Sequence, residues 1–203
     1  MTRGVHLAIL GFAFVQAVSP LRGQSAPSGK APPPPLEVTL AYSSDRGTGS
    51  ANSNFWMQGG KAEFSAAFGR SFSLVGEIAG LHVSNVNSAN GGIGLLSYLI
   101  GPRFSYRGYS RFTPFGQVLI GGVYGFDAYF PNSNGLIGTP DGFAMAGGGG
   151  VNVPVSRRLA IRPVQVDYFQ TQLPNGAANR ENNLRLGAGI VFQIGPPRQG
   201  SVN

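Results

Sequence analysis

The feature that most constrains this chain is a two-residue alternation of apolar and polar side chains. Near the C-terminus, for example, Leu184, Leu186 and Ile190 fall on one face, while Arg185 and Gln193 fall on the other. A period of two belongs to an extended strand with one apolar face, whereas a helix shows a period near 3.6. Eight such segments are present, at residues 36–44, 55–69, 72–84, 95–106, 112–127, 142–155, 159–171 and 183–194.

The connections between these segments alternate between long and short. The long ones are 45–54, 85–94, 128–141 and 172–182, and the short ones are 70–71, 107–111 and 156–158. A membrane barrel has this arrangement, with short turns toward the periplasm and long loops outside. After the N-terminal 35 residues, no segment has the run of about 18 apolar residues that a membrane helix needs. The sequence therefore predicts an all-β fold, an eight-stranded antiparallel up-and-down transmembrane β-barrel.

The composition agrees with a barrel in lipid. Only 11% of residues are charged and 32 of 203 are glycine, while 42% are hydrophobic, too many for a disordered chain. A lysine or arginine that faces lipid at the midplane costs roughly 2–4 kcal/mol, so outward positions exclude charge. Because the interior of an eight-stranded barrel is narrow, we expect the glycine run 147–150 to face inward.

The N-terminus predicts export. Residues 5–18 form an apolar stretch of 14 residues, too short to cross a bilayer as a helix, and Pro20 ends it. We assign residues 1–25 to a cleaved signal peptide, 26–35 to a proline-rich linker, 36–195 to the barrel and 196–203 to a polar tail. The predicted location is the bacterial outer membrane. The alternative for the first segment is a buried helix of a globular fold.

Charge and cysteine content exclude several classes. The formal net charge is +7, but the arginines are scattered and only two lysines are present, so nucleic acid is not an expected partner. The absence of cysteine excludes disulfides and zinc–thiolate sites. No cluster of carboxylates has metal-binding spacing, and we expect no metal and no cofactor.

The charges within the strands fall on the face opposite the apolar stripe. Arg162 is the exception, and a bulge at Pro163 would bring it inside. With that shift the lumen holds four acids and four bases, which should pair because an unpaired buried charge is costly. We predict a polar, largely plugged lumen; the alternative is a set of rim charges in water. The residues are Glu37, Lys61, Glu63, Glu77, Arg103, Arg162, Asp167 and Arg185.

Aromatic residues gather near both ends of the strands, as expected for the two interfaces of a membrane. The alternative is that they are ordinary core aromatics. The group near the long loops contains Phe55, Trp56, Tyr124, Phe126, Tyr168 and Phe169, and the group near the short turns contains Phe68, Phe72, Phe104, Tyr106, Phe112 and Phe115.

Four motifs occur in order along the central strands: GPRF at 101–104, FTPFGQVL at 112–119, GGGGVNVP at 147–154 and IRPVQVDY at 161–168. Through them the chain resembles the small eight-stranded outer-membrane barrels of the opacity-protein and OmpA-type group, over about residues 36–195. The resemblance implies an outer-membrane monomer with a structural or surface-interaction role, weak channel activity in some members, and no catalytic residues. Such barrels often end on an aromatic residue that the barrel-assembly machinery reads. Here Phe192 is followed by a polar tail, and we assign it as an internal assembly signal.

Four other functions stay open. A small porin-like diffusion channel would need an open lumen. A lipid-modifying enzyme would use His82 and Ser84, which share a strand face, although a polar rim histidine is the simpler interpretation. A soluble lipocalin-like carrier would need charged residues outside, which this chain lacks. A surface adhesin would bind an extracellular ligand through the long loops, whose sequence names no ligand.

Overall fold

A computed structural model describes residues 36–48, 54–84, 92–109, 111–126, 130–132, 135–137, 140–173 and 180–195. The regular structure in these ranges is β-strand, and none of it is a helix long and apolar enough to cross a membrane. The strands are β1 (Leu36–Thr48), β2 (Asn54–Ala67), β3 (Phe72–Val83), β4 (Ile93–Ser105), β5 (Thr113–Phe126), β6 (Phe130–Asn132), β7 (Gly135–Ile137), β8 (Asp141–Pro154), β9 (Leu159–Thr171) and β10 (Glu181–Ile194).

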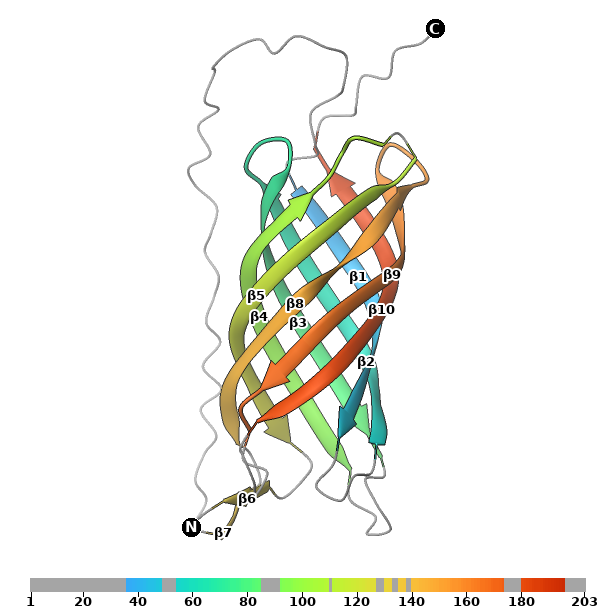
Figure 1. Ribbon diagram of the computed structural model, residues 1–203. Helices are drawn as coiled ribbons and strands as arrows, with labels where there is room; N and C mark the ends of the chain where they lie inside the picture. The colour runs from blue at the N-terminus through green and yellow to red at the C-terminus, as the bar shows by residue number, and fades with distance from the viewer. Residues whose placement is uncertain are drawn as a thin grey trace, which may run out of the picture. The chain divides into compact units, whose positions relative to one another are not determined.

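Eight of the strands form a closed barrel in the order β1-β10-β9-β8-β5-β4-β3-β2 (Figure 1). Each pair of neighbours is antiparallel, and β1 closes the barrel by pairing with β10 from Leu36↔Ile194 to Arg46↔Leu184. The predicted eight-stranded antiparallel barrel is therefore confirmed. The sequence did not predict the hairpin of β6 and β7, which lies in the third long connection and pairs Phe130 with Ile137.

The two ends of the barrel differ in their connections. The short turns lie at one end, at the top of Figure 1, and the strand ends that flank the long connections lie at the other. The turn between β2 and β3 is closed by the Phe68 amide, which donates to the Phe72 carbonyl at 2.8 Å. Gly69 in this turn has a φ of 101°, a conformation that side-chain-bearing residues rarely adopt.

The outer face of the barrel is apolar. Leu40, Phe64 and Ile120, from three different strands, have exposed fractions of 54%, 58% and 53%. Soluble monomers rarely expose contiguous apolar surface beyond a few hundred Å². An outward-facing apolar band is the surface that a transmembrane barrel presents to lipid.

The inner face has two walls of different chemistry. The wall formed by β8, β5, β4 and β3 is mostly apolar, and the wall formed by β9, β10, β1 and β2 carries most of the buried charges. We call the apolar set the inner apolar cluster; it comprises Met57, Val75, Leu81, Leu95, Leu99, Leu119, Val123, Ala144, Ala146, Phe169 and Leu173. The expectation of a polar lumen therefore describes only part of the interior.

The bulge expected at Pro163 is present in β9. The pairing with β10 shifts between Gly187↔Gln165 and Gly189↔Arg162, and the pairing with β8 shifts at the same level. Pro163 and Val164 both face outward, so Arg162 points inward and is 0% exposed. The extra residue restores the alternation that a regular strand would have broken.

The glycine run of β8 was predicted to lie inside the barrel, but only part of it does. Strand alternation places Gly148 on the inner face and Gly147 and Gly149 on the outer face. A Cβ at Gly148 would collide with the Val166 carbonyl and the Asp167 carboxylate, whereas a Cβ at Gly147 would meet nothing within 4 Å. Close packing inside the barrel therefore requires glycine at 148 but not at 147.

Candidate functional site

Glu63 of β2 lies at the centre of a buried network of charged side chains. Its Oε2 accepts hydrogen bonds from Arg103 Nη2 at 2.5 Å and from Arg162 Nη1 at 2.6 Å. Its Oε1 lies 3.2 Å from Lys61 Nζ. One carboxylate thus contacts three cations, and the Glu63 side chain is fully buried. Charge-assisted hydrogen bonds of this length are among the stronger interactions in proteins.

Lys61 joins this centre to a second group of acids. Its ammonium lies 3.3 Å from Glu77 Oε2 and 3.5 Å from Asp167 Oδ2, in addition to its contact with Glu63. Lysine can serve three acceptors because its ammonium has three donors on a flexible stem.

Arg185 of β10 completes the network toward the long-loop end. Its Nε contacts both Asp45 oxygens, at 3.1 and 3.0 Å, and its Nη1 donates to Glu77 Oε1 at 2.8 Å. The sequence analysis placed Asp45 in a loop, but β1 continues to Thr48 and Asp45 points inward with 0% exposure. The two-residue step from Glu37 through Thr39 leads to this position and could have indicated it.

Four ion pairs cross the lumen between strands that are not neighbours, and one of them is the contact of Lys61 on β2 with Asp167 on β9. Arg162 of β9 and Glu63 of β2 are separated in the barrel by β10 and β1. Arg185 of β10 reaches Glu77 of β3, and Arg103 of β4 reaches Glu63. These contacts connect opposite parts of the wall through the interior.

The network is balanced in charge and contains seven of the eight residues that we expected in the lumen. Its cations are Lys61, Arg103, Arg162 and Arg185, and its anions are Asp45, Glu63, Glu77 and Asp167. The eighth expected residue, Glu37, faces inward near the short-turn end. It pairs with Arg107 at 3.6 Å and not with the network.

Neutral side chains make further hydrogen bonds with two of the arginines, although Arg103 Nη1 and Arg185 Nη2 have no hydrogen-bond partner among the described residues. Gln117 accepts from Nε and Nη2 of Arg103. Arg162 donates to Asn152 at 2.9 Å and to Gln165 at 2.7 Å, and Gln165 donates to Asp167 at 2.7 Å. The sequence analysis did not identify these amides, because neutral polar residues on a strand face carry no distinctive pattern.

Two aromatic rings also hold the network. The Phe115 ring lies beneath the guanidinium carbons of Arg103 and Arg162, at 4.4 and 4.5 Å from its centroid. The guanidinium carbon of Arg185 lies 3.8 Å from the centroid of the Phe169 ring. The sequence analysis assigned both rings to the membrane interfaces, which is wrong: they are 7% and 0% exposed and lie inside. Contact with a desolvated cation over a ring face is favourable by cation–π attraction.

Several of the aromatics that the sequence predicted for the two membrane interfaces do lie on the outer face. Trp56, Tyr124 and Tyr168 are exposed toward the long-loop end, and Phe104 and Tyr106 are exposed toward the short turns. The Tyr168 hydroxyl donates to Asn182 at 2.7 Å. The described structure thus has an aromatic group at each end of the barrel, as the interface interpretation requires.

His82 and Ser84 lie on the outer face at the long-loop end of β3, where both are exposed. Among the described residues, neither side chain has a hydrogen-bonding partner and no carboxylate orients the histidine ring. The described ranges also contain no group of three or more histidine or acidic side chains placed to hold a metal ion. The assigned signal peptide, the linker, the tail and most of the long connections lie outside the described residues.

No protein-family model matches the chain, and no curated protein matches it in sequence. Solved structures do match its fold. Neisserial surface protein A aligns with a TM-score of 0.57 at 11% identity, over 78% of this chain and 97% of that one.

Ail, the attachment invasion locus protein of Yersinia pestis, aligns with a TM-score of 0.52 at 15% identity, over 81% of this chain and 100% of Ail. A second Ail structure, in complex with the heparin analogue sucrose octasulfate, aligns with a TM-score of 0.51 at 17% identity. The alignment covers 77% of this chain and 97% of the Ail chain. These proteins share the fold of this chain, a small eight-stranded barrel.

Proposed function

We propose that this chain is an integral outer-membrane β-barrel with a structural or surface-interaction role, whose lumen is closed by the charge network. One observation carries the proposal: an apolar outer face surrounds an interior whose charges are buried and paired across the barrel. A soluble lipocalin-like carrier would have the reverse polarity, with charge outside and a ligand cavity inside.

Closure rests on the contacts that cross the lumen. The guanidinium groups of Arg103, Arg162 and Arg185 span between strands that are two or three positions apart in the barrel order. Their side chains and those of their partners are at most 1% exposed. On the other wall, the inner apolar cluster fills the space. A small eight-stranded barrel has little room for a water path once side chains occupy its interior.

A surface role is supported by the kind of protein that shares the fold. Neisserial surface protein A and the attachment invasion locus protein Ail are named for the cell surface and for attachment, and barrels of this kind have their longer loops on the extracellular side. The binding of a sulfated sugar by Ail does not carry over. Among the described residues at the long-loop end, Arg46 and Arg180 are equalled in number by Asp141 and Glu181, so that end offers no excess of positive charge.

The remaining parts of the proposal concern export and assembly. A signal peptide at residues 1–25 would direct secretion, and Phe192, on the outer face of the last strand, would be read by the assembly machinery. We expect a monomer whose partners are the membrane lipids and an extracellular ligand at the loops.

Fractionation tests the location and the fold together. The protein should appear in the outer-membrane fraction and migrate faster on a denaturing gel before boiling than after it. The boiled sample provides the control, because heat unfolds the barrel and removes the shift. A single heat-independent band in the soluble fraction would reject the membrane barrel.

Conductance tests the closed lumen and separates the proposal from a diffusion channel. Purified protein in planar bilayers should give no steady large-conductance steps. The matched variant is Val75→Gly, which removes a fully buried side chain of the inner apolar cluster and leaves the charges in place. Steady large steps from the wild-type protein would establish a porin-like channel instead.

A further inference from the structure

The short-turn end of the barrel carries a concentration of arginines. The segments at 68–71, 106–112 and 155–158 contain no aspartate or glutamate. Their five arginines are Arg70, Arg107, Arg111, Arg157 and Arg158. At the opposite end, the two described arginines outside the charge network, Arg46 and Arg180, are equalled in number by Asp141 and Glu181. The excess positive charge of the barrel thus lies at one end.

Four of these five arginines have no acidic partner in the described part of the chain. Arg107 pairs with Glu37 at 3.6 Å and donates to the Arg70 carbonyl at 3.1 Å. The side chains of Arg70, Arg111, Arg157 and Arg158 form no ion pair with any described carboxylate, and all four residues are exposed. Their guanidinium groups are therefore available to an anion from outside the barrel.

Exposed aromatic rings lie among these arginines. Tyr109 stacks on Phe112 with ring centroids 4.5 Å apart and meets Tyr106 edge-on at 5.3 Å. Phe72 and Phe104 form a second edge-on pair at 5.2 Å. Aromatic rings concentrate where a protein crosses the headgroup region of a bilayer. The arginines therefore lie at the level of lipid headgroups and not far out in water.

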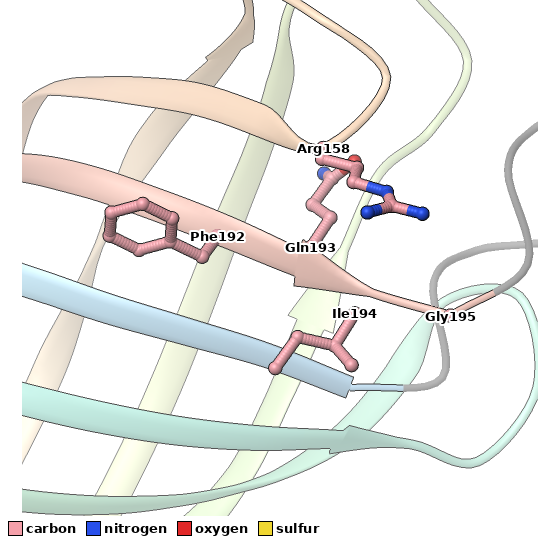
Figure 2. A pocket seen from close by; sticks show the side chains of 5 residues that line it. All are labelled: Arg158, Phe192, Gln193, Ile194 and Gly195. Carbon is pink, nitrogen blue, oxygen red and sulfur yellow. The ribbon is translucent and has the colours of Figure 1, made fainter.

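An open pocket of about 560 Å³ lies at the same end, lined by Arg158, Phe192, Gln193, Ile194 and Gly195. Figure 2 shows Arg158 beside the last residues of β10, with the side chains of Phe192 and Ile194 along that strand. The pocket combines an unpaired guanidinium with exposed apolar side chains on the lipid-facing surface. It suits a molecule with an anionic group joined to an apolar one.

We propose that the short-turn end is a docking surface for anionic phospholipids, whose phosphates contact the four arginines while one lipid occupies the pocket beside Arg158. The inference rests on the proposed membrane location. Arginine suits this role because its planar donors match the geometry of phosphate oxygens, and its apolar stem can lie along lipid. By contacting the short turns on the periplasmic side, bound lipid would hold the barrel at a defined depth in the membrane.

Other anionic occupants fit the surface less well. An acidic polymer such as the cell wall would contact the arginines but would leave Phe192 and Ile194 without an apolar partner. The side chains of the tail at 196–203 include Arg198 and no acid, so none of them complements the charge of Arg158. The acyl chains of a phospholipid satisfy the apolar side chains and its phosphate satisfies the guanidinium.

The experiment measures lipid selectivity of the full-length barrel in phosphatidylcholine nanodiscs. Spin-labelled phosphatidylglycerol and spin-labelled phosphatidylcholine are added separately, and the motionally restricted fraction gives their relative association constants. We expect the wild type to prefer phosphatidylglycerol. Removing Arg157 and Arg158 together by glutamine substitution should lower that preference by about five-fold or more, since each arginine near an anionic surface contributes roughly that factor. The preference should also fall as salt is raised.

The matched control is Arg46→Gln with Arg180→Gln, which removes two charges from the long-loop end and should leave the preference unchanged. An unchanged preference in Arg157→Gln/Arg158→Gln, or an equal loss in the control, would overturn the inference. Failure of the wild type to give a heat-shifted band in phosphatidylcholine would instead reject the membrane barrel itself. Arginine-dependent binding to purified cell-wall sacculi without lipid selectivity would assign the surface to the polymer and reject the lipid.

Discussion

The two halves of the inner wall fill the same narrow space by different means. On β8, β5, β4 and β3 the inner side chains are mostly aliphatic, whereas β9, β10, β1 and β2 supply six of the eight charged groups of the network. Each half needs the other, because Glu77 and Arg103 extend from the apolar side into the charges and Met57 and Phe169 extend the other way.

This difference predicts which half of the inner wall should tolerate substitutions and which half should not. Aliphatic packing is non-directional, so a smaller side chain leaves a cavity whose cost depends on how far the neighbours relax. A buried ion pair is directional, and the loss of one partner leaves a charge without compensation. Single substitutions should therefore be more harmful in the charge network than in the inner apolar cluster.

The largest effect is expected for Glu63→Gln. This change keeps the size of the side chain but leaves Lys61, Arg103 and Arg162 around a neutral amide, with a cost of about 3–5 kcal/mol. Urea unfolding in lipid vesicles, followed by the fluorescence of Trp56, the single tryptophan, measures it. The control is Glu37→Gln, outside the network, which loses an ion pair with the partly exposed Arg107 at 3.6 Å and should cost less than Glu63→Gln. Equal losses would remove the distinction between the network and the rim.

The second effect is a cavity in the apolar wall. Leu119 is fully buried, so Leu119→Ala should reduce the free energy of unfolding by about 2–4 kcal/mol. The same vesicle assay measures it. The neighbouring Val118 faces outward with 54% exposure, and Val118→Ala should have a much smaller effect. A larger loss at Val118 would mean that the inner and outer faces are misassigned.

The third prediction concerns coupling within the network. Combining Arg103→Met with Glu63→Gln leaves three buried cations and three buried anions, so the charge is balanced again. The double variant should lose about 1–3 kcal/mol less than the sum of the single losses. An equivalent cycle between Leu119 and Leu99 lacks a charge term and should be closer to additive. Strict additivity for Arg103 and Glu63 would show that their contact contributes little.

The smallest effect is expected on the outer surface. Tyr168→Phe removes the hydroxyl that donates to Asn182 and should cost about 0.5–1.5 kcal/mol. Asn182→Ala in the Tyr168→Phe background should then add little, because the shared bond is already gone. A loss as large as that of Glu63→Gln would contradict the view that the interior dominates stability.

Most of the fold could be predicted from the sequence, because most of the strands alternate over much of their length and each long loop contains turn-forming residues. The bulge at Pro163 was also predictable, since Arg162 would otherwise face lipid. Asp45 was missed because the Asp-Arg-Gly sequence resembles a turn, although the strand continues through it. A strand end placed at a turn-like sequence therefore misses the residues by which β1 continues to Thr48.

The apolar wall could not be predicted for a different reason. In β4 and β5 adjacent residues such as Leu95 and Leu96, or Leu119 and Ile120, are both apolar. A two-residue period then has no contrast, and the pattern does not say which residue faces lipid. Phe115 and Phe169 were misassigned because proximity to a strand end does not determine the face on which a ring lies. Pairing and register, which only the structure supplies, decide both points.

The bulge in β9 makes this strand one residue longer than its two neighbours require. Opposite the single residue Ala188 of β10 lie both Pro163 and Val164, so the strand contains slack at this point. Deleting Pro163 would leave Ile161 and Val164 outward and Arg162 and Gln165 inward, in regular alternation. A deletion at any unbulged position would instead move half a strand's side chains to the wrong face. The chain thus contains a place where its length can change by one residue while every side chain keeps its environment.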